Sequence, residues 1–310
     1  MTGPAAAVRH TEHVMGTVFS VTVRDPTART AAALERLAAR LHAIDAVFST
    51  YRPDSDVSRL GRGEAAPGDC HPDVAGVLAS CREVAEETGG WFTDRPGGRF
   101  DPSGWVKGWA VEEAARLLGA AGSREYCVAG GGDVQTAGGP WRIGVAHPLR
   151  PGALAAVLSG HDLAVATSGT AERGAHITDP FTGRPAGGFA SLTLVGSDGT
   201  GLARTDAWAT AAFAMGPGRA FDWLDGRPGV EALAVLPDGT QWRTDGFARH
   251  LPPAGPADWT LHRPPGAARN ARAGRGGGGA GGGGGAGGGG GGGGGAPPPG
   301  GPALPPRSRA

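Results

Sequence analysis

The chain has 310 residues, and its 29 Lys or Arg side chains balance its 29 Asp or Glu side chains, so the formal net charge is zero. This balance gives no reason to expect nucleic acid as a partner, and no apolar run is long enough to predict a transmembrane segment. The three cysteines form no C-x-x-C pair and no signal peptide or lipid-attachment motif is seen, so we expect a cytoplasmic protein with free thiols.

The spacing of apolar residues predicts the elements of the first half of the chain. Residues 1–10 are predicted to be flexible, and residues 11–250 are predicted to form the folded domain. Residues 14–23 are rich in β-branched side chains, which favours a strand. Helices are predicted at residues 28–48 and 72–88, and a third is predicted to start near residue 106. The inward face of the first helix is expected to consist of Leu34, Leu37, Leu41, Ile44 and Phe48.

The second half of the folded region is predicted to be rich in strands. They are expected at residues 126–129, from 134, and at 141–145, 163–167, 192–195 and 232–236, with a helix at 205–215. Strands and helices without strict βαβ alternation indicate an α+β fold with a mainly antiparallel sheet and flanking helices. Residues 251–310 are dominated by Gly, Pro, Ala and Arg, and we predict a disordered tail because they offer little apolar surface for a core.

Asp206 and Thr210 form the first constellation with possible chemistry. Residues four apart on a helix lie on the same face, one turn above the other. A carboxylate and a hydroxyl are hard oxygen ligands of the kind that Mg²⁺ prefers, and Mg²⁺ commonly takes its remaining ligands from water and substrate phosphate. The structural alternative is that Asp206 caps the start of the helix while Thr210 packs.

The second constellation is the segment FDPSGWVKG at residues 100–108. It predicts a tight loop that leads into the first turn of a helix, where free backbone N–H groups attract phosphate. Lys107 would add a cation there, and it is the only lysine in the chain. A purely structural explanation is also open, in which Asp101 or Ser103 caps the helix and Gly104 permits the turn.

The third constellation is HITDP at residues 176–180, preceded by ATSG at 166–169. A neutral histidine near a strand end can act as a general base toward a hydroxyl nucleophile, although His176 can equally be a structural histidine. The GGGD segment at residues 130–133 lacks the spacing of a dinucleotide fingerprint and is followed by a predicted strand, so a Rossmann domain is rejected.

Taken together, these segments resemble the ApbE family, the FAD:protein FMN transferases. The matching stretches occur in the family's order between residues 15 and 216. They are MGT at 15–17, FSTYR at 48–52, DSDVS at 54–58, DPSG at 101–104 with KG at 107–108, GGD at 131–133, ATSG at 166–169, HI and DP at 176–180, TG at 182–183, and the segment from Asp206 to Gly216. Each motif is weak alone, but nine in the same order favour the functional interpretations over the structural ones.

The resemblance implies a role for each matched position. It implies an α+β fold with the cofactor between the sheet and its flanking helices. Mg²⁺ would be held by Gly104 through its carbonyl, by Asp206 and by Thr210. His176 would be the base, and Lys107 would act on the diphosphate. The residues expected to line the FAD site are Met15, Tyr51, Trp91, Phe92, Thr93, Asp101, Lys107 and Ile177.

One region departs from the family pattern. After the second helix the family has an Asp where this chain has Thr93, followed by Asp94, so one contact to FAD is altered or shifted by one residue. Many members also carry an export or lipid-anchor signal, and none is seen here.

The expected activity is the Mg²⁺-dependent transfer of the FMN half of FAD to a Thr or Ser hydroxyl of an acceptor protein with an FMN-binding domain, with release of AMP. Two alternatives remain open at this point. In the first, water replaces the acceptor hydroxyl and the protein is an FAD pyrophosphatase. In the second, the protein is a flavin carrier without catalysis.

Overall fold

A long antiparallel sheet forms the centre of the structure, a computed structural model that describes residues 6–171, 174, 176–197 and 199–252. Its strand order is β1-β2-β3-β4-β7-β8-β9-β10, and each neighbouring pair is antiparallel. The strands are β1 (Val8–Val14), β2 (Thr17–Val23), β3 (Tyr126–Gly130), β4 (Asp133–Ala137), β7 (Ala164–Gly169), β8 (Ser191–Gly196), β9 (Val230–Val235) and β10 (Gln241–Arg243). The predicted α+β class with a mainly antiparallel sheet is confirmed.

The N-terminal strand prediction was wrong in its extent. Residues 14–23 do not form one strand, because Met15 and Gly16 both have positive φ and close a two-residue turn between β1 and β2. Turns of this kind match the twist of the strands that they join. Strand β1 also begins at Val8, inside the segment that was predicted to be flexible. The predicted tail falls, from residue 253 onward, outside the described residues.

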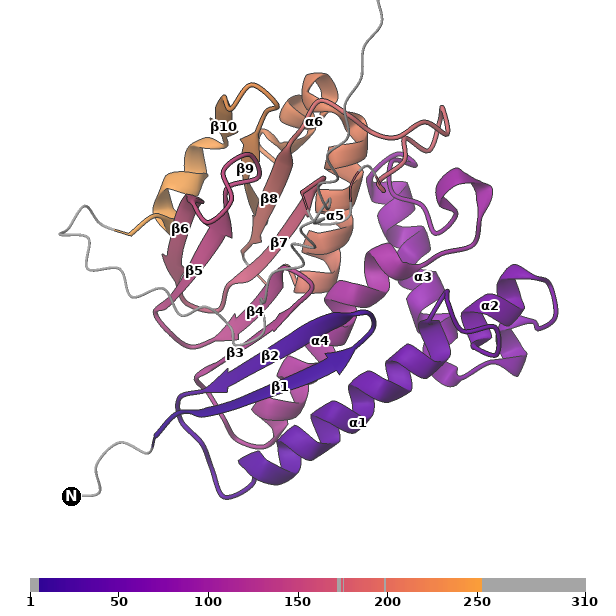
Figure 1. Cartoon of the computed structure of the whole chain (residues 1–310), viewed down its shortest axis with the longest axis vertical. Coiled ribbons are helices and arrows are strands. Elements are labelled where there is room, and N and C mark those ends of the chain that lie inside the picture. Colours follow the sequence, from indigo (N-terminus) through magenta and orange to yellow (C-terminus); the bar gives the residue numbers. More distant parts are fainter. Residues whose placement is uncertain (1–5, 172–173, 175, 198, 253–310) are drawn as a thin grey trace, which may run out of the picture. The chain divides into compact units, whose positions relative to one another are not determined.

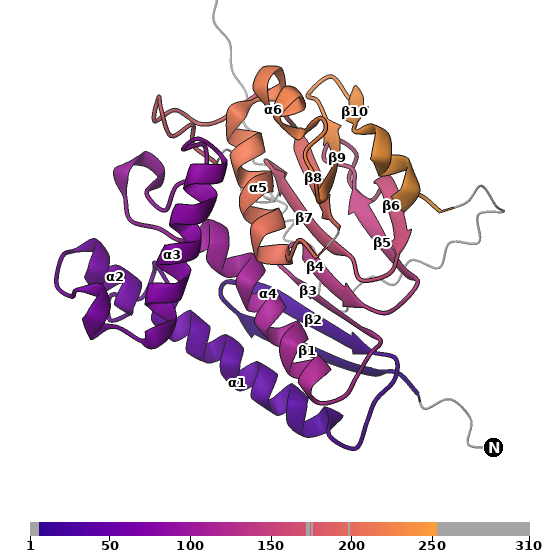
Figure 2. The same cartoon turned by 180° about the vertical axis from the view of Figure 1, so that it is seen from behind.

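Helices cover one face of the sheet, as the two opposite views in Figure 1 and Figure 2 show for α4 and α5. They are α1 (Thr30–Phe48), α2 (Asp56–Gly61), α3 (Pro72–Glu87), α4 (Ser103–Ala120), α5 (Leu202–Met215) and α6 (Pro217–Leu224). Short 3₁₀ turns lie at Pro67–Asp69, Pro96–Gly98 and Asp245–His250. The predicted inward face of the first helix is confirmed, since all five of its apolar residues are buried.

The other face of the sheet is covered by a separate hairpin, formed by β5 (Trp141–Ala146) and β6 (Leu154–Gly160). Successive side chains of a strand point to opposite faces, so neighbouring residues enter different cores. In β7, for example, Ala164 and Ala166 join the core beneath the helices, while Val165 packs into the smaller core beneath the hairpin. Burial of both faces explains why β8 and β9 are buried at every position and why, apart from Glu231, their residues are apolar or small.

Helices α4 and α5 pack closely because Gly108 has no side chain. A Cβ atom at Gly108 would lie 2.9 Å from the Ala203 Cα and 3.0 Å from both the Leu202 carbonyl oxygen and the Asp206 Cβ. The start of α5 is held to α4 by Glu112, whose Oε1 accepts a hydrogen bond of 3.0 Å from the Ala203 N–H. None of the helices in the described residues is long and apolar enough to cross a membrane.

Candidate functional site

Three charged side chains from different elements meet beneath the helices. Lys107 of α4 forms an ion pair with the Asp133 carboxylate at the start of β4, and its Nζ lies 3.2 Å from Asp206 Oδ1 of α5. The Asp133 and Asp206 side chains are 0% and 3% exposed, and that of Lys107 is 20% exposed. We call these three residues the Lys107 cluster. It combines two buried carboxylates with one lysine side chain that is mostly buried.

Glycines leave the room in which this cluster forms. Gly131 and Gly132 both adopt positive φ in the turn between β3 and β4, a conformation that favours glycine. A Cβ atom at Gly131 would lie 3.1 Å from the Lys107 Cδ, so the bare backbone there lets the lysine stem pass. On the other side, Gly108 lets α5 approach α4 closely enough for Asp206 to reach Lys107.

Asp133 is fixed from two directions. Its Oδ1 accepts a hydrogen bond of 3.2 Å from the Thr167 N–H of β7, and its Oδ2 is paired with Lys107. Thr167 belongs to the ATSG segment, and its Oγ1 lies 2.9 Å from Thr193 Oγ1 of β8. Both carboxylate oxygens of Asp133 are therefore engaged, and the position of Lys107 is tied to the register of β4 and β7.

One carboxylate oxygen of Asp206 has no hydrogen-bond partner among the described residues. Its Oδ1 faces Lys107, but its Oδ2 is buried and has no hydrogen-bond partner. Burial, followed by the charge of Asp133, raises the pKa of Asp206, and the Lys107 ammonium and the Gly108 N–H oppose this rise. For Lys107, burial lowers the pKa, but the two carboxylates outweigh it, so the pKa lies above its ordinary value and the ammonium stays charged. With two carboxylates and one ammonium, the cluster favours a further cation.

The donors around Asp206 fit a magnesium ion. Thr210 lies one helical turn beyond Asp206 on α5, and Asp206 is not the cap of that helix, because α5 begins at Leu202. In a helix the N–H of residue 108 points to the carbonyl of residue 104, and the Gly108 N–H also lies against the Asp206 carboxylate. The Gly104 carbonyl and the Asp206 carboxylate therefore both lie near the Gly108 N–H. One carboxylate, one hydroxyl and one carbonyl are hard oxygen donors.

The described residues contain no group of three or more His, Cys, Asp or Glu side chains arranged to hold a metal. A metal at Asp206 would therefore depend on non-carboxylate oxygens, water and substrate. This is how Mg²⁺ is commonly bound at phosphate-transfer sites.

The residues after α3 form a wall beside the start of α4. Phe92 is fully buried, and a Cβ atom at Gly104 would lie 3.2 Å from its ring. Trp91 is partly exposed and meets the ring of Phe181 edge to face, with the ring centroids 4.8 Å apart. Thr93, which stands where the family has an Asp, accepts a hydrogen bond at its Oγ1 from the Arg95 N–H. Its hydroxyl thus stabilises the loop in which it lies.

Asp101 lies at the start of α4, where it shapes the helix end. Its Oδ1 accepts a hydrogen bond of 2.9 Å from the Ser103 N–H, but Pro102 occupies the cap position, so neither Asp101 nor Ser103 is the helix cap. The helix consequently begins at Ser103 and not near residue 106. This corrects the position of Lys107, which lies in the second turn of α4 and not in the first.

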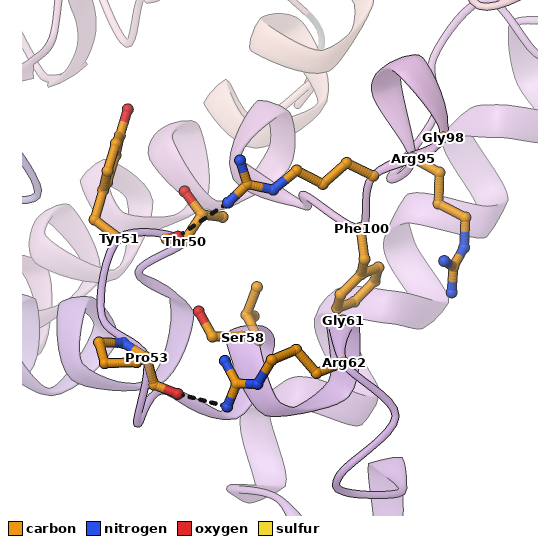
Figure 3. A pocket seen from close by; sticks show the side chains of 11 residues that line it. Thr50, Tyr51, Pro53, Ser58, Gly61, Arg62, Arg95, Gly98 and Phe100 are labelled. Atoms are coloured by element: carbon orange, nitrogen blue, oxygen red, sulfur yellow. Dashed lines mark hydrogen bonds between the residues drawn. The ribbon is translucent and has the colours of Figure 1, made fainter.

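Tyr51 lines a separate pocket, shown in Figure 3. The pocket has a volume of about 400 Å³, and Thr50, Tyr51 and Pro53 lie across it from Arg95 and Phe100. The Tyr51 side chain is 96% exposed, so its ring face is free to stack. The residues that line this pocket do not include any of the Lys107 cluster.

The remaining predicted site residues lie outside the helices and strands. Met15 forms part of the β1–β2 turn and packs partly against the main core. Ile177 is buried in that core. His176 lies exposed on the connection between β7 and β8, and its Nδ1 is 3.0 Å from the Gly174 carbonyl oxygen. The hydrogen bond of His176 is therefore made to its own loop and not to the Lys107 cluster.

Comparison with known proteins shows to which family this chain is related. The ApbE family model matches residues 15–94 and 93–234, which together span most of the chain. The chain belongs to the ApbE family. The solved structures of the flavin transferase ApbE from Vibrio cholerae and of the ApbE protein from Thermotoga maritima align with TM-scores of 0.70 and 0.71. Their sequences are 21% and 22% identical to this chain, respectively. Each alignment covers 80% of this chain and 100% of the solved chain, so the similarity shows that the fold is shared.

Two curated relatives of this ApbE-family chain are named FAD:protein FMN transferase. The protein of Rhodobacter capsulatus is 33% identical over 189 residues, which is 55% of this chain but only 35% of that protein. The protein of Salmonella typhimurium is 25% identical over 78% of this chain and 87% of its own length. The chain thus spans about a third of the first relative and most of the second.

Asp133 is the residue of the ApbE-family site to which the sequence assigned no role. The match of the GGD segment to the family pattern gives no reason to assign chemistry to its carboxylate. The available signal was an acidic residue that directly follows three glycines and begins a strand. Its partner, Lys107, is 26 residues away in sequence, and only the packing of α4 on β4 brings the two together.

Proposed function

We propose that this chain is a Mg²⁺-dependent FAD:protein FMN transferase, which moves the FMN half of FAD to a Thr or Ser hydroxyl of an acceptor protein and releases AMP. Membership of the ApbE family and the names of the curated relatives support flavin transfer. The observation that carries the metal assignment is the buried Asp206 Oδ2, which has no hydrogen-bond partner beside the Lys107 ammonium.

The proposal assigns the cation to Gly104, Asp206 and Thr210, through a carbonyl, a carboxylate and a hydroxyl. Bound Mg²⁺ would offset the negative charge of the FAD diphosphate and so lower the barrier to phosphoryl transfer. Lys107 contributes a positive charge next to this position, because the carboxylates of Asp206 and Asp133 keep its ammonium protonated. Asp206 must be ionised to bind the metal, and a dication beside it would favour the ionised form.

His176 is suited to accept a proton from an incoming hydroxyl. If its Nδ1–H donates to the Gly174 carbonyl, its Nε2 carries the lone pair and can act as a base. His176 is exposed, so a side chain of another protein can reach it. In the proposed step the hydroxyl proton passes to Nε2, and the hydroxyl oxygen bonds to the FMN-side phosphorus. The bond from that phosphorus to the AMP oxygen breaks.

The aromatic side chains suit the flat rings of FAD. Tyr51 offers an exposed ring face, and Trp91 with Phe181 forms an edge-to-face pair beside the start of α4. Five further positions remain proposed contacts to FAD, on the basis of the family resemblance. They are Met15, Phe92, Thr93, Asp101 and Ile177. The acceptor is proposed to be a protein with an FMN-binding domain.

Purified protein incubated with FAD, Mg²⁺ and an FMN-accepting domain tests the reaction class. A transferase leaves the denatured acceptor fluorescent, whereas a pyrophosphatase yields free FMN and AMP, and a carrier leaves FAD intact. His176→Ala should retain FAD binding and lose transfer, and the exposed His161→Ala is the matched control. Transfer by His176→Ala at the rate of His161→Ala would overturn the base assignment.

A further inference from the structure

We propose that Asp133 is a positioning residue. It holds the Lys107 ammonium when a divalent cation binds Asp206 and displaces the ammonium from that carboxylate. This inference rests on the proposed metal site at Asp206. It assigns to the GGD segment a function in metal loading that the turn alone does not explain.

The first step of the argument is that Lys107 already acts as a cation at Asp206. Its Nζ lies 3.2 Å from Asp206 Oδ1 and is also paired with the Asp133 carboxylate. A dication that binds Asp206 must therefore share that carboxylate with the ammonium or displace it. Because a buried ammonium without a counter-ion is strongly unfavourable, Lys107 needs another partner at that moment.

The second step is that the two carboxylates are not equivalent. Asp133 has its Oδ1 bound by the Thr167 N–H and its Oδ2 paired with Lys107, and its side chain is fully buried. Asp206 has a free Oδ2 and lies one turn before Thr210 on α5. The free oxygen and the nearby hydroxyl direct the dication to Asp206, while the fixed geometry of Asp133 keeps the ammonium.

The third step concerns where the ammonium is held. Lys107 reaches the cluster past Gly131, where a Cβ atom would lie 3.1 Å from its Cδ. The turn that carries Asp133 thus also confines the lysine stem. Held by Asp133, the ammonium remains beside the proposed metal position.

The unique lysine of this chain makes the proposal directly measurable. Protein labelled with ¹⁵N at the lysine Nζ gives a single side-chain ammonium signal, which needs no assignment. The signal is visible when the ammonium is held and protected, and it broadens when its protons exchange rapidly with water. Spectra are recorded without FAD, with and without Mg²⁺, for the wild type, for Asp133→Asn and for the exposed surface control Asp222→Asn.

We expect the wild type and Asp222→Asn to keep a sharp ammonium signal that shifts when Mg²⁺ is added. In Asp133→Asn we expect Mg²⁺ to broaden the signal beyond detection, because the displaced ammonium has no buried partner. Calorimetry should show Mg²⁺ affinity reduced by about 10- to 100-fold in Asp133→Asn, as for other residues that support metal ligands. An Asp133→Asn signal that stays sharp with bound Mg²⁺ would overturn the proposal.

The wild-type spectra decide the matter even where Asp133→Asn does not fold, which its circular dichroism would reveal. Loss of the wild-type ammonium signal on Mg²⁺ binding would show that Asp133 does not retain Lys107. If calorimetry instead detects no Mg²⁺ binding to the wild type, the metal assignment fails and this inference fails with it. If the wild type binds Mg²⁺ but its ammonium signal is lost, the result refutes only the role of Asp133. The proposed transferase function would not be affected by that result.

Discussion

Replacing Gly108 with alanine would separate the two helices that carry Lys107 and Asp206. The new Cβ would lie 2.9 Å from the Ala203 Cα, about half an ångström short of the 3.4 Å at which ordinary contact begins. It would also lie 3.0 Å from the Leu202 carbonyl oxygen. Both of these atoms belong to the backbone, so the strain cannot be relieved by a side-chain rotation, and α5 must move away from α4.

Gly76 provides a matched control. It lies within α3, and a Cβ atom there meets nothing within 4 Å. Alanine favours a helix over glycine by about 1 kcal/mol at either position, so the difference between the two variants reports the packing at Gly108. Overpacking of this kind costs about 1–3 kcal/mol, and each kcal/mol lowers Tm by about 2–4 °C in a domain of this size.

Thermal unfolding followed by circular dichroism measures the effect. We expect Gly108→Ala to melt below Gly76→Ala by at least a few degrees, and to bind Mg²⁺ more weakly, because the new Cβ would also lie 3.0 Å from the Asp206 Cβ. Gly76→Ala should retain the wild-type Mg²⁺ affinity. If Gly108→Ala and Gly76→Ala raised Tm equally, the close contact between α4 and α5 would be refuted. The packing explanation for glycine at position 108 would then fail as well.

Three further outcomes follow from the structure. Tyr51→Ala should leave the free energy of unfolding within about 0.5 kcal/mol of the wild type, because the ring is almost fully exposed, while FAD affinity measured by fluorescence falls. Mg²⁺ at 100 times its Kd should stabilise the wild type by about 2.7 kcal/mol in thermal melts, and Asp206→Asn should abolish this gain. Hydrogen bonding to Arg116, with further help from Arg40, lowers the pKa of Glu113, so its stabilisation is present above its ordinary pKa and is lost as the pH falls through the lower value. Glu113→Gln should therefore weaken the acid dependence of urea unfolding below about pH 4.5, and an unchanged slope would contradict this assignment.

The local patterns in the sequence were sufficient for elements whose stability depends on one repeated spacing. Helix α1 buries Leu37, Leu41 and Ile44 along one stripe, so helical periodicity alone identified its inward face. The β1–β2 hairpin was missed because β-branched residues continue on both sides of Met15 and Gly16. Their positive φ angles are a property of the turn that hydrophobic spacing does not report.

Longer-range contacts decided what the patterns left open in the candidate site. The sequence also allowed Asp206 to be a helix cap, and the structure rejects that role because α5 starts a turn earlier, where Glu112 of α4 accepts a hydrogen bond from the Ala203 N–H. Asp133 received no predicted role, since its importance depends on Lys107 and on the Thr167 N–H of another strand. Sequence motifs thus predicted which face of α5 would bind the proposed metal, while tertiary packing revealed Asp133 as the counter-ion of Lys107.

Intact mass of an acceptor domain after incubation with FAD tests the central claim most directly. The account predicts that with wild-type enzyme and Mg²⁺ the acceptor gains the mass of one FMN less one water, and that its mass stays unchanged with Asp206→Asn or with a chelator. The same gain in the presence of a chelator, or an unmodified acceptor beside consumed FAD, would contradict metal-dependent transfer at Asp206.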